Sequence, residues 1–181
     1  MNRSRGFTLP ELLATTALLG SLLALALPAF NTLIEHTRAN AVAHRLQAEL
    51  SLAREAALFQ RRHIAFCRTD DQQRCTPVGA WSRGTMTFED RNRNLHREAH
   101  EPLLRITQTA DYHGLHLIDH SVRRHIRFRP DGRSAGTNLT LRLCSKSLKP
   151  LRLVIINTGG RVRSIRPPHG TPKCGSDDLP H

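Results

Sequence analysis

The residues best suited to binding chemistry are arginines near the C-terminus. Residues 159–166 read Gly-Gly-Arg-Val-Arg-Ser-Ile-Arg. In a β-strand, Arg161 and Arg163 would share one face about 6.7 Å apart, while Val162 points to the other face. Paired guanidinium groups at this spacing suit bidentate contacts with successive phosphates. The alternative is that the arginines only keep an edge strand soluble. Candidates to extend the patch are Arg166, Arg152, Lys149 and Lys146.

The stretch from Asp90 to Glu101 partly matches a calcium-binding loop. It places acids or amides at the first, third and fifth positions and Glu at the twelfth. The sixth position is Leu95 where the pattern needs glycine, and the flanks resemble strands rather than helices. We therefore expect a hairpin loop, with calcium as the alternative. His96 and His100 lie in this stretch without an evident third metal ligand.

Common catalytic patterns are absent from the sequence. Gly-x-Ser-x-Gly, His-Glu-x-x-His and the phosphate-loop pattern do not occur. No Ser or Cys is accompanied by a base that spacing alone could assign to it. The sequence therefore predicts neither an enzyme nor a bound cofactor.

The overall charge favours a polyanionic partner. Lys and Arg total 27 against 15 Asp and Glu, a formal net charge of +12. Such a surplus attracts nucleic acid, anionic lipid or surface glycan. Only 4% of the residues are aromatic, which argues against a base-stacking platform for single strands.

The N-terminal region contains an apolar run from Leu12 to Phe30 without any charge. This run is close to the roughly 20 residues that a helix needs to cross a bilayer. No small-residue cleavage site of an ordinary signal peptide follows it. We expect a membrane helix over residues 7–30, preceded by a basic leader at 1–6.

The start of the chain resembles the type IV prepilin leader. Arg3 and Arg5 precede Gly6, and Phe7-Thr8-Leu9 leads to Glu11, the fifth residue after the glycine. The resemblance implies that a prepilin peptidase cleaves after Gly6 and methylates Phe7, leaving a net charge of +10 once both arginines are lost. It also implies that Glu11 pairs with the Phe7 amine of a neighbouring subunit, since a carboxylate in an apolar bundle needs a partner. Pro10 departs from the usual aliphatic residue but is tolerated in a first helical turn. The alternative is a plain signal anchor.

The leader resemblance also implies where the protein resides. The chain is expected to cross the bacterial inner membrane once, with its C-terminal part in the periplasm. From there it would enter a type IV pilus or pseudopilus at or beyond the cell surface.

The helical pattern continues over residues 31–60, with a possible kink at Pro28. Its apolar face comprises Val42, Leu46, Leu50, Ala53 and Ala57. The polar residues expected largely off this face are Arg38, His44, Glu49, Arg54 and Glu55.

From residue 61 to 181 the apolar period changes to two, which is typical of strands. The predicted strands are His63–Cys67, Thr85–Phe88, Leu103–Ile106, Ile126–Phe128, Leu139–Leu143 and Leu151–Ile156. The expected fold class is therefore α+β, with a long N-terminal helix packed on antiparallel sheet.

This β-rich region resembles the GspH/FimT group of minor pilins and pseudopilins. The matching positions are Trp81, Gly84, Phe88, Asp90, Asn92, Asn94, Glu101, Leu104, Arg105, Phe128, Pro130, Gly132 and Gly160 to Arg163. The resemblance implies a type IV pilin-like fold and a low-abundance subunit that assembles with other major and minor pilins, often near the filament tip.

Within this group, FimT-like members with a Gly-Arg-x-Arg ending are linked to DNA binding during natural transformation. The implied partner is double-stranded DNA, bound without sequence preference. The alternative is a structural GspH-type pseudopilin that primes or caps the filament of a type II secretion system.

Four cysteines, Cys67, Cys75, Cys144 and Cys174, allow three complete pairings. Export, which the leader resemblance implies, would permit disulfides. We favour Cys67 with Cys75, which closes a short loop, and Cys144 with Cys174, which ties the C-terminal segment to the sheet. A zinc site is the alternative, although no close Cys-x-x-Cys pair occurs.

Overall fold

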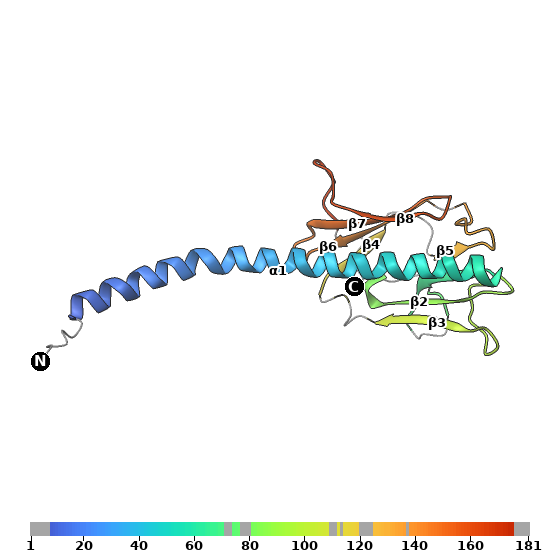
Figure 1. Cartoon of the computed structure of the whole chain (residues 1–181), viewed down its shortest axis with the longest axis horizontal. Coiled ribbons are helices and arrows are strands. Elements are labelled where there is room, and N and C mark those ends of the chain that lie inside the picture. Colours follow the sequence, from blue (N-terminus) through green and yellow to red (C-terminus); the bar gives the residue numbers. More distant parts are fainter. Residues whose placement is uncertain are drawn as a thin grey trace, which may run out of the picture. The chain divides into compact units, whose positions relative to one another are not determined.

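The computed structural model describes residues 8–70, 74–76, 81–108, 112, 114–119, 125–136 and 138–175. The chain forms two compact units, Met1–Thr37 and Arg38–His181. The elements in chain order (Figure 1) are α1 (Leu9–Gln60), β1 (Ile64–Arg68), the 3-10 turn η1 (Trp81–Arg83), β2 (Gly84–Glu89), β3 (Leu103–Gln108), β4 (His116–Asp119), β5 (His125–Phe128), β6 (Leu139–Cys144), β7 (Pro150–Ile156) and β8 (Val162–Ile165).

The first unit holds the N-terminal part of α1. The Thr8 carbonyl accepts hydrogen bonds from the amides of Glu11 and Leu12, both at 3.1 Å, and the helix starts at the next residue. By length and composition, α1 contains an 18-residue stretch apolar enough to cross a membrane, and none of this stretch is buried. The hydroxyls of Thr16 and Ser21 donate to helix carbonyls at 2.8–3.0 Å. In a bilayer core, where no water is available, such internal bonds would satisfy these hydroxyls.

In the second unit, the apolar face of α1 packs into the core as expected. Val42, Leu46, Leu50, Ala53 and Ala57 are each at most 2% exposed. They form one cluster with inward side chains from the strands of both sheets. The spacing of these residues therefore predicted the packed face of the helix correctly.

The first sheet has the strand order β3-β2-β1-β5 and is antiparallel throughout. The register pairs Ile64 with Phe128 and Phe66 with Ile126, so these four side chains share the face toward α1. The ring of Phe66 stacks on Trp81, with centroids 5.5 Å apart. The Trp81 indole nitrogen donates to Asp119 Oδ2 at 2.7 Å, so a buried aromatic residue keeps its polar atom satisfied.

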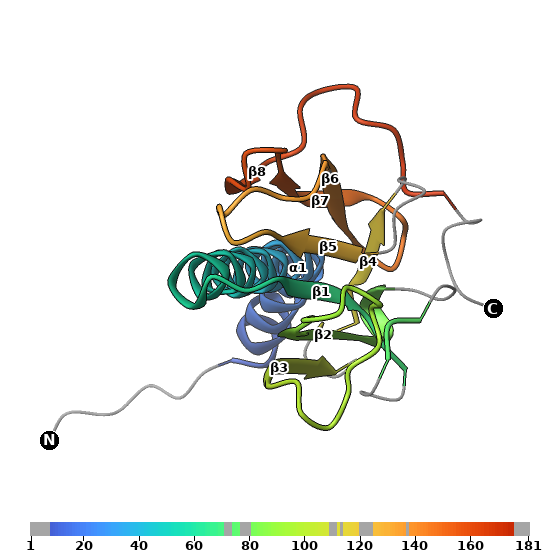
Figure 2. The same cartoon turned by 90° about the vertical axis from the view of Figure 1, so that its right-hand side faces the viewer.

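The second sheet has the order β4-β6-β7-β8, also antiparallel. Leu139, Leu141 and Leu143 pair with Ile156, Val154 and Arg152. In Figures 1 and 2, β8 and β3 lie at opposite extremes of the two sheets with α1 between them. The shared cluster thus joins one helix face to two sheets.

The six predicted strands are confirmed as β1, β2, β3, β5, β6 and β7. Strand β4 was not predicted, because its four residues begin with His and end with Asp and offer little alternation. The predicted α+β class, with a long N-terminal helix and antiparallel sheet, is confirmed.

The prediction that Glu49 lies off the apolar face of α1 is wrong. Its side chain is buried, and Thr87 and Thr107 donate hydroxyl hydrogen bonds to its two oxygens at 3.1 and 3.2 Å. The Arg105 Nε atom lies 3.7 Å from Glu49 Oε2. Burial raises the pKa of Glu49, while the two hydroxyls, Arg105 and Arg45 oppose the shift.

Glu49 should make the second unit more stable in acid. Its folded-state pKa lies above the unfolded-state value, so the folded protein takes up the proton first as the pH falls from 7 toward 4.5. We expect Glu49→Gln to raise the free energy of unfolding at pH 7, and this gain to disappear at acidic pH. Unfolding followed by Trp81 fluorescence measures this, and the exposed Glu55→Gln controls for the loss of one charge. A gain that stayed constant with pH would contradict the assignment.

Candidate functional site

The C-terminal arginines lie on the hairpin formed by β7 and β8. The turn is closed by hydrogen bonds from the Gly160 amide to the Asn157 carbonyl at 2.8 Å and from the Asn157 amide to the Arg161 carbonyl at 3.2 Å. The Asn157 side-chain oxygen also accepts from the Arg161 amide at 2.9 Å. This network fixes the backbone from which Arg161 extends.

Gly160 fits a space that no other residue could occupy without movement. Its φ is +77°, and an added Cβ would lie 2.0 Å from the Gly132 carbonyl oxygen. That oxygen already accepts a hydrogen bond from Arg54 Nε at 2.9 Å. The structure therefore places the loop around Gly132 and the helix residue Arg54 directly behind the arginine hairpin. Arg54 was expected off the apolar face of the helix, and it is partly buried beside the loop around Gly132.

Arg161 and Arg163 are both exposed, while Val162 between them is partly buried and packs against the core cluster. Arg163 pairs with Ile155 of β7, and β8 is the edge strand of its sheet. The alternation expected from the sequence therefore holds, and both guanidinium groups are carried on a solvent-facing edge.

Arg152 lies on the opposite face of this sheet, contrary to its candidate role. The register places it with Leu143, and its Nε donates to Asn40 Oδ1 on α1. This contact places it on the helix side of β7, so we leave Arg152 out of the patch.

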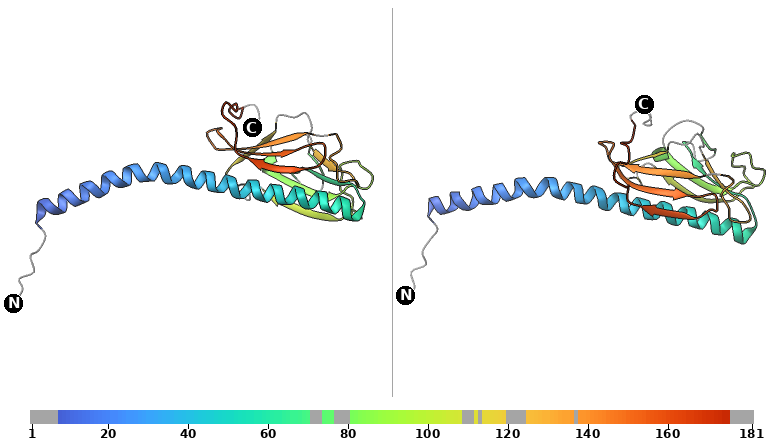
Figure 3. Two further views of the ribbon diagram at one scale, coloured as in Figure 1. Left: turned by 45° about the horizontal axis from the view of Figure 1, so that its top comes forward. Right: turned by 90° about the horizontal axis from the view of Figure 1, so that it is seen from above.

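The remaining candidates extend along the sheet rather than around Arg161. Arg166 is exposed just after β8, and the exposed Lys146 and Lys149 lie in the turn between β6 and β7. Cys144 pairs with Pro150 at that turn, whereas Leu139 pairs with Ile156 at the arginine end. From Asn157 to Pro150 is about 24 Å along an extended strand. Figure 3 shows β7 and β8, orange to red, side by side, and the register pairs β8 with Leu153 to Ile156 of β7.

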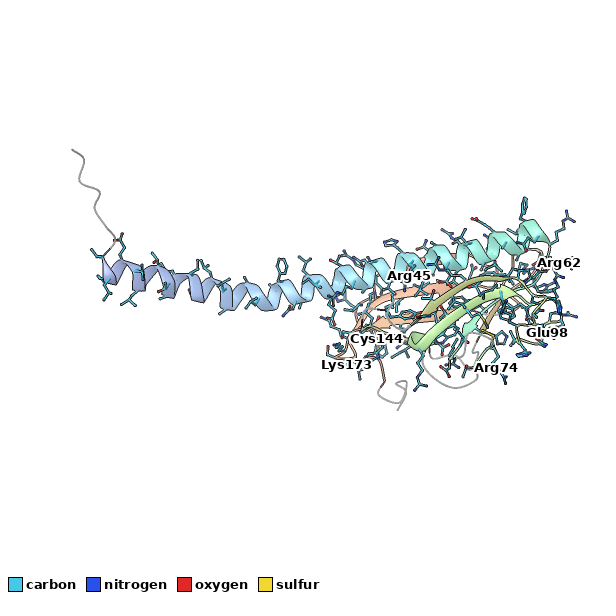
Figure 4. All side chains as sticks on the ribbon, turned by 90° about the horizontal axis from the view of Figure 1, so that it is seen from below. Arg45, Arg62, Arg74, Glu98, Cys144 and Lys173 are labelled. Atoms are coloured by element: carbon cyan, nitrogen blue, oxygen red, sulfur yellow. A yellow bond between two sulfur atoms is a disulfide. The ribbon has the colours of Figure 1, made fainter. Side chains whose placement is uncertain are left out.

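Figure 4 marks the two ends of the second unit by labelled side chains. Arg62 and Glu98 lie at one end, and Cys144 and Lys173 lie at the other. We call these the Arg62 end and the Cys144 end. Arg161 belongs to the Arg62 end, because its neighbour Gly160 contacts Gly132, whose carbonyl is bound by Arg54 of α1. Lys146 and Lys149 follow Cys144 directly and belong to the Cys144 end.

None of the five exposed cations just described has an ion-pair partner within the described part of the chain. These five, which we call the basic row, are Arg161, Arg163, Arg166, Lys146 and Lys149. Their charges are therefore not neutralised by nearby described acids, and the row presents a surface suited to an extended polyanion.

Both disulfides are present with the pairing favoured from the sequence. Cys67 bonds to Cys75 and Cys144 to Cys174, with Cα–Cα distances of 5.5 and 6.5 Å. Cys144 and Cys174 pack with Ile118 and Leu148 in a small apolar cluster. The second disulfide holds the segment after β8 beside the turn that carries Lys146 and Lys149.

The stretch from Asp90 to Glu101 is the loop of the β2–β3 hairpin, as expected. Its oxygens are occupied by internal hydrogen bonds: Asp90 accepts from Arg127 and Leu95, and Glu101 accepts from the amides of Arg91 and Glu98. Within the described residues, no group of three or more His, Cys, Asp or Glu is arranged to hold a metal ion. These contacts account for the spacing of the polar residues without calcium.

Of the N-terminal residues predicted to act in processing and assembly, the structure describes Glu11. Gly6 and Phe7 lie outside the described residues. Glu11 occupies the first turn of α1 and is exposed. An acid there is also favoured by the partial positive charge of the helix N-terminus.

Comparison with known proteins agrees with this architecture. The family model described as type II transport protein GspH matches residues 42–160, more than half of the chain. The chain belongs to the GspH family. Residues 1–27 also match the prokaryotic N-terminal methylation motif. The chain is thus a member of a family of structural minor pilins and pseudopilins, with a prepilin-type N-terminus.

Solved structures show the same fold. The type IV minor pilin FimU of Pseudomonas aeruginosa aligns with a TM-score of 0.53 at 23% identity, over 71% of this chain and 87% of FimU. E. coli GspH aligns with a TM-score of 0.51 at 14% identity, over 76% of this chain and 94% of GspH. A search of curated proteins gave no match. Membership of the family implies assembly with other pilins.

Proposed function

We propose that this GspH-family chain is a minor type IV pilin that enters the pilus and binds DNA, supporting DNA uptake in natural transformation. The observation that carries the proposal is the exposure of Arg161, directly before the edge strand β8, and of Arg163 within it, both without an ion-pair partner among the described residues. The net charge of +12 supports the same reading.

The basic row has the dimensions of a short duplex contact. A surface of about 24 Å spans roughly seven base-pair steps of 3.4 Å. Arginine and lysine contacts to phosphates position a protein without reading bases. We therefore propose that binding is independent of DNA sequence, with Arg161 and Arg163 at one end and Lys146 and Lys149 at the other.

Salt dependence gives a sharp test of this role. If about four phosphates are neutralised, log affinity should fall against log salt with a slope near −3.6, and Arg161→Gln/Arg163→Gln should flatten the slope by about 1.8. The measurement is a salt titration of duplex binding by the full chain in uncharged detergent, with duplexes of two unrelated sequences. The matched control is Arg61→Gln/Arg133→Gln, which removes two exposed arginines outside the basic row. Equal slopes for the native protein and the Arg161/Arg163 variant would exclude these arginines as the site.

A structural pseudopilin is the second candidate. It is supported by the match to the GspH model and by the fold shared with E. coli GspH. In this reading the chain primes or caps a type II secretion filament, and the basic row only keeps an edge strand soluble. Absence of duplex binding at low salt would favour this candidate.

Assembly in either filament is proposed to follow the prepilin route. The match to the methylation motif supports cleavage between Gly6 and Phe7 by a prepilin peptidase, with methylation of Phe7. The apolar stretch of α1 would hold the chain in the inner membrane, with the second unit in the periplasm. Glu11 would then pair with the Phe7 amine of a neighbouring pilin. Mass spectrometry of the membrane-extracted chain reads the new N-terminus, and a start after Phe30 would exclude this route.

A further inference from the structure

A second positively charged feature lies at the Arg62 end, apart from the basic row. It is a cavity of about 490 Å³ whose lining includes His63, Arg93, Arg127, Arg129 and Asp131. His63 follows the end of α1, Arg93 lies in the β2–β3 loop, and the other three belong to β5 and the loop after it. Residues far apart in the sequence therefore converge on one cavity.

The charges around this cavity do not cancel. Arg127 is neutralised by the buried Asp90, with an N–O distance of 2.9 Å, and also donates to the Arg93 carbonyl at 2.8 Å. Arg129 faces Asp131 at 3.7 Å, and both side chains are about half exposed, so this pair is weak. Arg93 has no ion-pair partner among the described residues. A net positive charge thus remains at the cavity.

The imidazole of His63 lines the same cavity, so its protonation depends on that charge. Its Nδ1 atom is buried and makes no hydrogen bond with the described residues. Burial lowers the pKa of His63, and Arg127, Arg93 and Arg129 lower it further, against a weaker opposing effect of Asp90. A bound anion would offset the net positive charge that remains at the cavity and would supply an acceptor for a protonated ring.

We propose that this cavity binds an oxyanion of the phosphate class, held by Arg93 and Arg129 beside the His63 ring. Guanidinium groups form strong, charge-assisted hydrogen bonds to phosphate oxygens. The Asp131 carboxylate competes with a bound anion for Arg129, so it lowers the affinity of the cavity for the oxyanion. The site is independent of Arg161 and Arg163, although the loop residue Gly132 contacts Gly160 on the arginine hairpin.

The test follows His63 by NMR in the full chain in uncharged detergent, with inorganic phosphate added at constant ionic strength. His63→Gln identifies the signal among the 11 histidines. Phosphate should raise the pKa of His63 in the native protein. Arg129→Gln should weaken phosphate binding by at least about tenfold, and Asp131→Asn should strengthen it. Arg133→Gln, an exposed arginine in the same loop outside the lining, is the matched control and should bind phosphate like the native protein.

A short duplex replaces phosphate in a second series, to identify the source of the oxyanion. A His63 response to both ligands would support a site filled by the nucleic-acid backbone, and a response to phosphate alone would support a free oxyanion. An unchanged His63 titration with both ligands would overturn the proposal. The phosphate series does not require DNA binding, so it separates failure of this site from failure of the basic row.

Discussion

Replacing Gly160 with alanine should lower the free energy of unfolding by at least about 2 kcal/mol, because two costs add. The backbone at residue 160 has φ +77°, a region that disfavours a side chain, and the new methyl carbon would lie 2.0 Å from the Gly132 oxygen. Neither the turn nor the loop can relax freely, since Arg54 Nε holds the same oxygen at 2.9 Å. Trp81 is the single tryptophan and is buried against Phe66, so its fluorescence reports unfolding of the second unit.

The neighbouring glycine provides the matched control. An added Cβ at Gly159 would come no closer than 3.4 Å to Asn157 Oδ1, and its backbone does not have a positive φ. Gly159→Ala should therefore change stability by less than about 1 kcal/mol. If both variants were equally stable, the close packing of Gly160 on Gly132 would be refuted. Gly160→Ala should also weaken duplex binding without altering the charge, because it displaces the backbone of Arg161.

Arg127→Met should destabilise the second unit by about 3–5 kcal/mol. The Asp90 carboxylate is fully buried, accepts a hydrogen bond from Arg127 Nε at 3.0 Å, and lies 2.9 Å from a second guanidinium nitrogen of Arg127. Without Arg127, the one donor to this carboxylate that remains among the described residues is the Leu95 amide, at 3.3 Å. The cost arises from a buried charge left without its counter-charge rather than from the attraction of the pair itself.

A double variant separates these two contributions. Arg127→Met/Asp90→Asn removes both charges and should regain at least half of the lost stability, measured by the same unfolding curves. Arg129→Gln breaks the exposed pair with Asp131 and should cost less than about 1 kcal/mol. A double variant as unstable as Arg127→Met alone would contradict the stranded-charge explanation.

Local sequence patterns predicted the helix and most of the strands, but not which residues contact one another in the folded chain. The alternation of Arg161, Val162 and Arg163 needs only the period of a strand, so their faces followed from the sequence. Arg152 could not be assigned in this way, since residues 151–156 are mostly apolar on both faces and alternation does not identify the buried one. The register, fixed by the pairing with Leu143, decides it.

Glu49 shows the same limit for the helix. Its spacing of three from Leu46 and four from Ala53 places it on the apolar face, but its charge suggested solvent. Burial is tolerated because Thr87 and Thr107 supply hydroxyls from two adjacent strands. Tertiary packing decides which strands contact the helix at Glu49, and a local sequence pattern carries no information about these strands.

The order of strands along the chain ties the two sheets to one another. Strand β4 of the second sheet precedes β5, which completes the first sheet by pairing with β1. A single cut in the chain therefore cannot release either sheet as an exchangeable module. The first sheet is complete only when Ile64 of β1 pairs with Phe128 of β5, and pairings between residues so far apart in the sequence slow folding. Residues 38–60 of α1 precede every strand in the chain and pack against both sheets, so they provide one shared packing surface for the two interleaved sheets.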